Sequence, residues 1–228
     1  MKYGKIRYTY MLTEANKQVR IEHAIKLLST DISRVLLSDE SFFQLNENGL
    51  SVCHQEYAEL YKEKKEKSYK NKQCMVWGVI CISVKSTLYI HSTSIDSDAY
   101  IQCLGDSLIP MGIQNYGNRK KWYLLQDGAR CHTSKKTLDW CASNKVNKIQ
   151  NCLWSPDTNP IELVWGAQHE EKLQKKQLNN VSFGNREHLE QIILEIWEEQ
   201  SQEFINKCIN HVVNILPEII ETIGFYLI

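Results

Sequence analysis

Trp122-Tyr-Leu-Leu-Gln-Asp127 is the stretch that decides the fold class, because it is a short apolar strand that ends in an aspartate. Arg34-Val-Leu-Leu-Ser-Asp39 has the same form. In open α/β sheets, ligand sites lie beyond the carboxyl ends of the strands. We therefore expect Asp39 and Asp127 to lie at one functional edge of a sheet.

Further strands and helices alternate around these two segments. Helical periodicity predicts helices in residues 1–30, 96–108 and 134–144, the second ending before Pro110. Apolar, β-branched and aromatic runs predict strands in 41–45, 74–91 and 148–153. Helices then gather in 160–173, 189–197 and 204–213. This order predicts an α/β mixed sheet flanked by helices, with a helical C-terminal part.

The composition is that of an ordinary globular protein. The chain has 228 residues, of which 43% are hydrophobic and 24% charged, which excludes disorder, collagen and coiled coil. No apolar run is long enough to span a membrane, and the N-terminus lacks the apolar core of a signal peptide. The eight cysteines form no C-x-x-C pair. We therefore expect free, mostly buried thiols in a reducing compartment, nuclear or cytoplasmic.

The charge is polarised along the chain, although its formal sum is zero. Residues 1–150 hold 22 Lys and Arg against 15 Asp and Glu, whereas residues 151–228 hold 5 against 12. Such a distribution can present a basic face to a polyanion such as DNA. The alternative is that acidic helices simply lie at the end of the chain.

Three acids occupy fixed points at the ends of elements. Asp39 and Asp127 close apolar strands, and Glu162 stands at the third position of a helix that Asn159 caps and Pro160 begins. Carboxylates repel one another, so their convergence favours a hard divalent cation such as Mg²⁺ or Mn²⁺. Two such ions suit phosphoryl transfer on DNA.

Each acid also has a local interpretation. Glu162 alone fits a capping box, in which its carboxylate accepts from the backbone N–H of Asn159. Asp39 and Asp127 alone fit turn residues that follow a strand. Only the combination of the three favours a shared site.

Four ordered motifs carry a resemblance to a known family. They are Leu36-Leu-Ser-Asp-Glu-Ser41, Met75-Val-Trp-Gly78, Leu125-Gln-Asp-Gly-Ala-Arg-Cys-His-Thr133 and Trp154-Ser-Pro-Asp-Thr-Asn-Pro-Ile-Glu-Leu-Val-Trp-Gly166. Together they resemble the DDE endonuclease domain of Tc-one-like and mariner transposases. The 34 residues between Asp127 and Glu162 match the glutamate-bearing branch of that family.

The resemblance implies a ribonuclease-H-like fold and a catalytic, metal-binding triad of Asp39, Asp127 and Glu162. It implies metal-dependent hydrolysis at a transposon end, followed by attack of the freed 3′-hydroxyl on target DNA. Glu40 is excluded from this triad because successive strand residues face opposite ways. His132 is a possible DNA phosphate contact, and positioning the start of its helix is the alternative.

Other motif residues are expected to be structural, namely Trp77, Trp165 and Asp157. The lysine-rich segment Tyr61–Lys72 is a candidate for nonspecific DNA contact through Lys64, Lys65 and Lys67. The alternative for this segment is a solvated loop.

The expected organisation is an N-terminal helical linker (1–30), a catalytic core (31–180) and C-terminal helices packed on the core (181–228). The family's N-terminal helix-turn-helix modules have no counterpart in this sequence, so site-specific recognition is not expected from this chain alone. DNA and a second copy of the chain are the expected partners, and no membrane is. A nuclease with another purpose and a domesticated, non-enzymatic binding module are the alternative functions.

Overall fold

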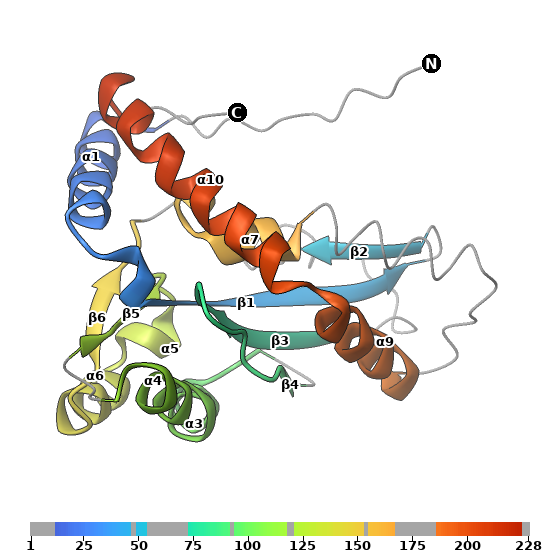
Figure 1. Ribbon diagram of the computed structural model, residues 1–228. Coiled ribbons are helices and arrows are strands. Elements are labelled where there is room, and N and C mark those ends of the chain that lie inside the picture. Colours follow the sequence, from blue (N-terminus) through green and yellow to red (C-terminus); the bar gives the residue numbers. More distant parts are fainter. Residues whose placement is uncertain are drawn as a thin grey trace, which may run out of the picture.

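The computed structural model describes residues 12–46, 49–53, 73–91, 94–117, 121–152, 155–166 and 186–224. A mixed sheet forms the middle of the molecule, and helices lie on both sides of it (Figure 1). The strands are β1 (Val35–Asn46), β2 (Gly49–Cys53), β3 (Gln73–Ile80), β4 (Tyr89–His91), β5 (Tyr123–Gln126) and β6 (Asn147–Gln150).

The helices confirm the predicted gathering of helical structure at the C-terminal end. They are α1 (Glu14–Leu28), α3 (Ser97–Cys103), α4 (Ile109–Tyr116), α5 (Arg130–Thr133), α6 (Lys135–Ser143), α7 (Pro160–Trp165), α9 (Arg186–Glu199) and α10 (Gln202–Glu221). The described residues also contain two short 3₁₀ turns, η1 (Ile32–Arg34) and η6 (Pro156–Thr158), and one π-helical turn, η4 (Leu104–Leu108).

The sheet has the order β4-β3-β1-β5-β6, and β2 pairs with the far end of β1. β1 is antiparallel to β3 and β2, whereas β1, β5 and β6 are parallel to one another. Leu37 of β1 lies opposite Leu125 of β5. Two residues further along the same register, Asp39 comes level with Asp127, so the parallel strands deliver both acids to one edge.

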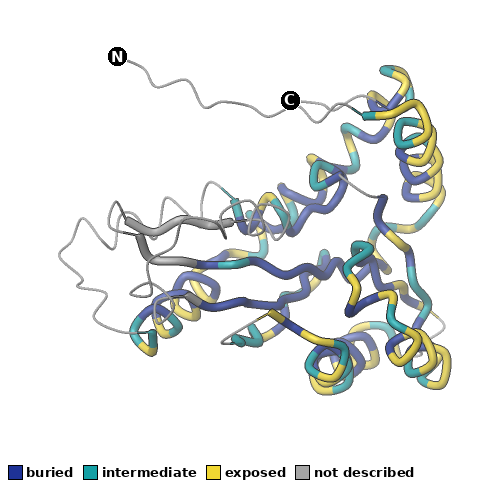
Figure 2. The backbone as a smooth tube through the Cα atoms, turned by 180° about the vertical axis from the view of Figure 1, so that it is seen from behind, coloured by how far each residue is buried: buried dark blue, intermediate teal, exposed yellow. Residues whose placement is uncertain are grey.

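Two hydrophobic cores lie on the two faces of the sheet. Val35 and Leu37 share one core with α1, α7, α9 and α10, while Leu36 shares the other with α3, α4 and α6. Figure 2 shows the central strands buried between the more exposed outer helices. By strand alternation, Asp39 faces the α7 side and Glu40 faces the α5 side.

Three sequence-based boundaries were wrong. The separate strands predicted on either side of Glu40 are one continuous strand, β1, because the polar residues between them are buried inside the sheet. The helix predicted to end at Leu108 continues to Tyr116 through η4, in which the Ile109 N–H bonds to the Leu104 carbonyl and the ladder is shifted just before Pro110. The strand predicted for 148–153 is β6, which ends at Gln150.

Other expectations were confirmed. The helix predicted in 134–144 is α6, which Ser134 caps by accepting the Thr137 N–H, and the strands predicted in 74–91 are β3 and β4, which pair antiparallel with each other. The seven cysteines whose side chains the structure describes are free and buried. Within the described residues, no helix combines the length and apolar character that a bilayer crossing requires.

Candidate active site

Asp39 lies inside β1, opposite Gly78 of β3, and its side chain is buried. Its Oδ2 atom has no hydrogen-bond partner among the described residues. Burial raises the pKa of Asp39 well above its usual value, and the charges of Glu162, Glu40 and Asp127 raise it further. Asp39 is therefore the residue on which the other acids of the site converge.

Glu162 reaches this site because the start of α7 is attached to β1. Asn159 precedes the helix, and its side-chain amide donates to the backbone carbonyl of Ser38 at 3.2 Å rather than capping α7. The backbone N–H of Asn159 donates to the carbonyl of Pro156 at 3.1 Å. The Asn159 N–H, which would donate to Glu162 in a capping box, thus already has an acceptor. The charge of Glu162 acts on Asp39 instead.

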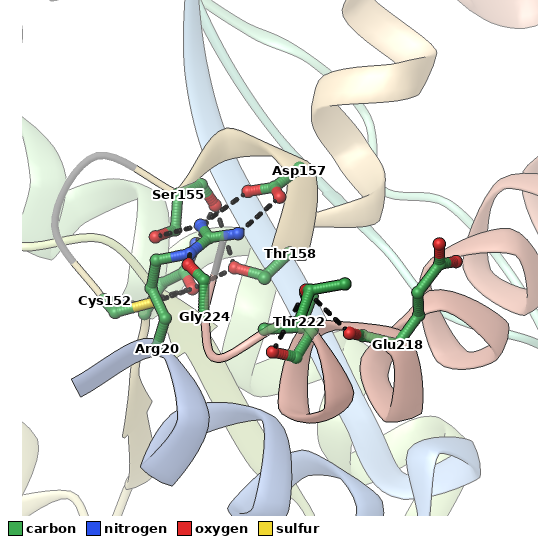
Figure 3. A network of polar contacts seen from close by, with 10 residues as sticks. Arg20, Cys152, Ser155, Asp157, Thr158, Glu218, Thr222 and Gly224 are labelled. Atoms are coloured by element: carbon green, nitrogen blue, oxygen red, sulfur yellow. Dashed lines mark hydrogen bonds and ion pairs between the residues drawn. The ribbon is translucent and has the colours of Figure 1, made fainter. Parts of the chain in front are cut away.

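A buried arginine holds the turn that leads into α7 (Figure 3). Arg20 of α1 binds both carboxylate oxygens of Asp157, at 2.8 and 2.6 Å, and donates to the Ser155 hydroxyl at 2.6 Å. Its Nε donates to the carbonyl of Gly224 at 2.9 Å. Gly224 has a φ of +77°, and a Cβ there would lie 2.4 Å from the Lys17 carbonyl oxygen. Asp157 therefore has the structural role expected of it.

Asp127 follows β5 and remains 41% exposed. Its Oδ1 accepts the Ala129 N–H at 2.9 Å and lies 2.6 Å from Nδ1 of His132. Burial acts to raise the pKa of Asp127, but the hydrogen bond and charge of His132 outweigh it and hold that pKa below its usual value. Asp127 is therefore ionised at neutral pH, and its Oδ1 is held in place by His132 and by the Ala129 N–H.

His132 in turn contacts Glu40, which lies on the α5 side of the sheet, opposite to the side that Asp39 faces. Its Nε2 lies 3.0 Å from Oε1 of Glu40, and both side chains are 1% exposed. Burial acts to lower the pKa of His132, whereas the charge of Glu40 and the hydrogen bond to Asp127 raise it well above its usual value. Both ring nitrogens face carboxylates, which argues against the predicted phosphate contact of His132.

Sequence reasoning missed the part that Glu40 plays in the site. Glu40 does face away from Asp39, as strand alternation predicts, but it reaches Asp127 through the ring of His132. The available signal was a histidine five residues after Asp127, in the first turn of structure beyond β5.

The two motif tryptophans and the three predicted lysine contacts remain to be placed. Trp77 is fully buried and makes edge contacts with Tyr89 and Tyr100, and Trp165 stacks on Trp197 at 5.1 Å, so both tryptophans pack the cores. The predicted DNA contacts Lys64, Lys65 and Lys67 lie outside the described residues.

The donor set fits a hard divalent cation. Asp39, Asp127 and Glu162 offer carboxylate oxygens, the ligands that Mg²⁺ and Mn²⁺ prefer. The buried Oδ2 of Asp39 lacks a hydrogen-bond donor among the described residues, and a cation beside it would offset the repulsion that raises the pKa of Asp39. Glu40, Asp127 and His132 also offer ligand atoms within 4.8 Å of one another. Both ring nitrogens of His132, however, already contact the carboxylates of Glu40 and Asp127.

Comparison with known proteins gives a consistent picture. Residues 34–190 match the family described as DDE superfamily endonuclease. The Tc3 transposase of Caenorhabditis elegans is 29% identical over 223 residues, which cover 96% of this chain and 65% of that protein. The chain thus spans about two thirds of the length of this relative.

Solved structures share the fold. The catalytic domain of Mos1 transposase with raltegravir and Mg has a TM-score of 0.70 at 17% identity, covering 96% of this chain and all of that one. The Mos1 paired-end complex with the left transposon end has a TM-score of 0.68 at 15% identity, covering 99% of this chain and 68% of that one. This likeness confirms the predicted ribonuclease-H-like fold.

Proposed function

Because the chain belongs to the DDE superfamily of endonucleases and has the catalytic domain of a Tc1/mariner-type transposase, we propose that it cleaves DNA and joins the freed strand to a target. In this reaction water attacks a phosphodiester and releases a 3′-hydroxyl, which then attacks a second DNA strand. The single observation that carries the proposal is that the parallel strands β1 and β5 bring Asp39 and Asp127 to one edge of the sheet, where the Asn159–Ser38 hydrogen bond attaches the start of the helix that bears Glu162.

Asp39, Asp127 and Glu162 would hold the divalent cation in this proposal. Two Mg²⁺ or Mn²⁺ ions, when bound, supply charge that stabilises the attacking and leaving oxygens of the phosphodiester. Each acid comes from a different element, β1, the end of β5 and the first turn of α7, so the site forms only when the sheet and α7 pack together. A bound cation would favour the ionised form of Asp39, whose pKa is raised by burial and by the neighbouring acids, whereas His132 already holds the pKa of Asp127 below its usual value.

DNA is the proposed partner, and a second copy of the chain is proposed alongside it. The fold likeness to a paired-end complex with a transposon end supports both. Work on chromosomal DNA would place the protein in the nucleus. The DNA contacts of Lys64, Lys65 and Lys67 and the division into segments 1–30, 31–180 and 181–228 stay proposals. The packing of the C-terminal helices on the core is supported by α9 and α10 sharing one core with the sheet.

Nothing in the described residues favours the alternative of a non-enzymatic binding module. Such a module gains nothing from burying Asp39 beside other acids, and burial of like charges destabilises a fold. An arrangement that costs stability is typical of an active site.

A nicking assay on supercoiled DNA tests the proposal. The wild-type protein with Mn²⁺ is expected to convert supercoiled plasmid into nicked circles, and Asp127→Asn to produce none. Asp139→Asn is a matched control, since Asp139 is an exposed acid on α6 paired with Lys135, and it should nick like the wild type. Absence of nicking by the wild type, or nicking that persists in Asp127→Asn, would contradict the proposal.

A further inference from the structure

We propose that Glu40 and His132 are positioning residues that orient Asp127 for cation binding, with Glu40 acting through the His132 ring. This inference rests on the proposed function and extends it to two residues outside the acidic triad.

The His132 ring is fixed at both nitrogens. Nε2 lies 3.0 Å from Oε1 of Glu40, and Nδ1 lies 2.6 Å from Oδ1 of Asp127. Glu40 belongs to the central strand β1, where it lies opposite Trp77 of β3 in the antiparallel ladder. The ring therefore links Asp127, which lies beyond the end of β5, to Glu40, which is held within β1.

Aromatic packing sets the plane of the same ring. The Tyr100 ring lies over that of His132, with centroids 4.1 Å apart and planes inclined by 37°. The hydroxyl of Tyr100 donates to the side chain of Gln126 at 2.7 Å, and Gln126 directly precedes Asp127. His132 thus has three anchors: Glu40, the Tyr100 face and Asp127.

Asp127 needs such an anchor because its side chain is only partly enclosed. It is 41% exposed, so without a partner its carboxylate would sample several rotamers. The contacts from His132 and from the Ala129 N–H both use Oδ1. They fix the rotamer and leave Oδ2 for a cation, which reduces the ordering that binding would otherwise require.

The placement of Glu40 is hard to explain by stability alone. A buried carboxylate is costly even when paired, and an apolar residue of similar size is often as stable or more so. Glu40 also raises the pKa of Asp39, so it adds repulsion to the site. A contact that fixes a ligating carboxylate offers a reason for an acid at this position, because such outer partners affect metal affinity by about 10–100-fold.

Two pairs of variants separate positioning from packing. His132→Asn and His132→Gln both remove the ring, but the Asn amide lies near the place of Nδ1 and can donate to Asp127, whereas the Gln amide reaches the place of Nε2 and contacts Glu40 instead. Glu40→Gln and Glu40→Ala both remove the charge, but only Gln keeps an acceptor for Nε2. Within each pair the hydrogen bond under test differs, and the accompanying change in side-chain volume is followed by the melting temperature in EDTA.

The readout is the Mn²⁺ dissociation constant of the full chain, measured from the electron paramagnetic resonance signal of free Mn²⁺, with the melting temperature in EDTA as a check on folding. We expect His132→Gln to weaken Mn²⁺ binding by about 10-fold or more and His132→Asn to recover most of that loss. Glu40→Ala should bind Mn²⁺ more weakly than Glu40→Gln. If His132→Gln does not fold, the Glu40 pair decides.

Equal Mn²⁺ affinities within each pair would overturn the inference. Equal and complete loss in both His132 variants would instead make His132 a direct metal ligand, which also overturns it. Failure of the proposed function looks different, because the wild-type protein itself would then bind no Mn²⁺.

Discussion

Arg20 and Asp157 are 137 residues apart in the chain and form a two-point ion pair in which the arginine side chain is 0% exposed. The pair joins α1 to η6, the turn that leads through Asn159 into the helix carrying Glu162. A contact outside the acidic site thus fixes the element that supplies one of its acids.

Replacing one partner of this pair should destabilise the protein strongly. Arg20→Met leaves the Asp157 carboxylate without its bidentate partner, and breaking a buried pair in this way costs about 3–5 kcal/mol. Urea denaturation should show this loss. In the Arg20→Met/Asp157→Asn double variant the loss should be well below the sum of the two single losses.

Lys135→Met provides the control for a surface pair. Lys135 and Asp139 are 90% and 64% exposed, respectively, so this change should leave the free energy of unfolding almost unchanged. Additive effects of the Arg20 and Asp157 substitutions would show that the two side chains act independently.

His23 should make the stability depend on pH. Burial, together with the nearby charges of Lys26 and Arg20, lowers its pKa to about 4. The unfolded chain therefore binds a proton that the folded chain does not between about pH 6.5 and pH 4. Stability should fall by about 3 kcal/mol as the pH drops through that range, and this contribution should be complete below pH 4.

Urea denaturation at several pH values between 7 and 4.5 measures this effect, with His23→Gln as the comparison. The difference in free energy of unfolding between the two proteins should shrink on acidification, because Gln does not titrate. A pH-independent difference would mean that His23 binds protons equally well in both states.

Neutralising Asp39 should stabilise the metal-free protein. The raised pKa of Asp39 means that folding disfavours a carboxylate which is ionised in the unfolded chain at neutral pH, so Asp39 lowers the stability of the metal-free protein. Asp39→Asn should raise the melting temperature in EDTA by about 2–4 °C for each kcal/mol of repulsion removed. Millimolar Mn²⁺ should raise the melting temperature of the wild type by mass action but not that of the variant.

Gly78 should not tolerate a side chain. A Cβ at this position would lie 3.0 Å from Leu88 and 3.1 Å from Trp165 of α7, and overpacking of this kind costs about 1–3 kcal/mol. Gly105→Ala is the control, because its Cβ would meet Trp140 at an ordinary 3.6 Å. Thermal denaturation of the two variants should show a lower melting temperature only for Gly78→Ala.

Much of the fold could be predicted because the patterns are local. The apolar runs that end in Asp39 and Asp127, and the Asn-Pro start of α7, specify their elements without knowledge of the rest of the chain. The pattern of apolar and polar residues predicts the wrong strand boundaries where polar residues are buried inside a strand. Glu40 and its neighbours look like a break between strands, yet they lie inside β1 because they form part of the site.

The Glu40–His132 contact could not be predicted for a related reason. Strand alternation assigns each residue to one face of a sheet, but it no longer applies to Asp127, which lies past the end of β5. Asp127 contacts His132 on the α5 side of the sheet, while its charge also acts on Asp39, which faces the α7 side. The long-range position of Arg20 likewise depends on how α1 packs, which no local pattern specifies.

The most direct test of the account is a crystal structure of the protein soaked in Mn²⁺, with anomalous diffraction data to locate the ions. The account predicts an anomalous peak coordinated by carboxylate oxygens of Asp39, Asp127 and Glu162. A peak at other residues, or none at Mn²⁺ concentrations that support nicking, would show that these three acids do not form the cation site.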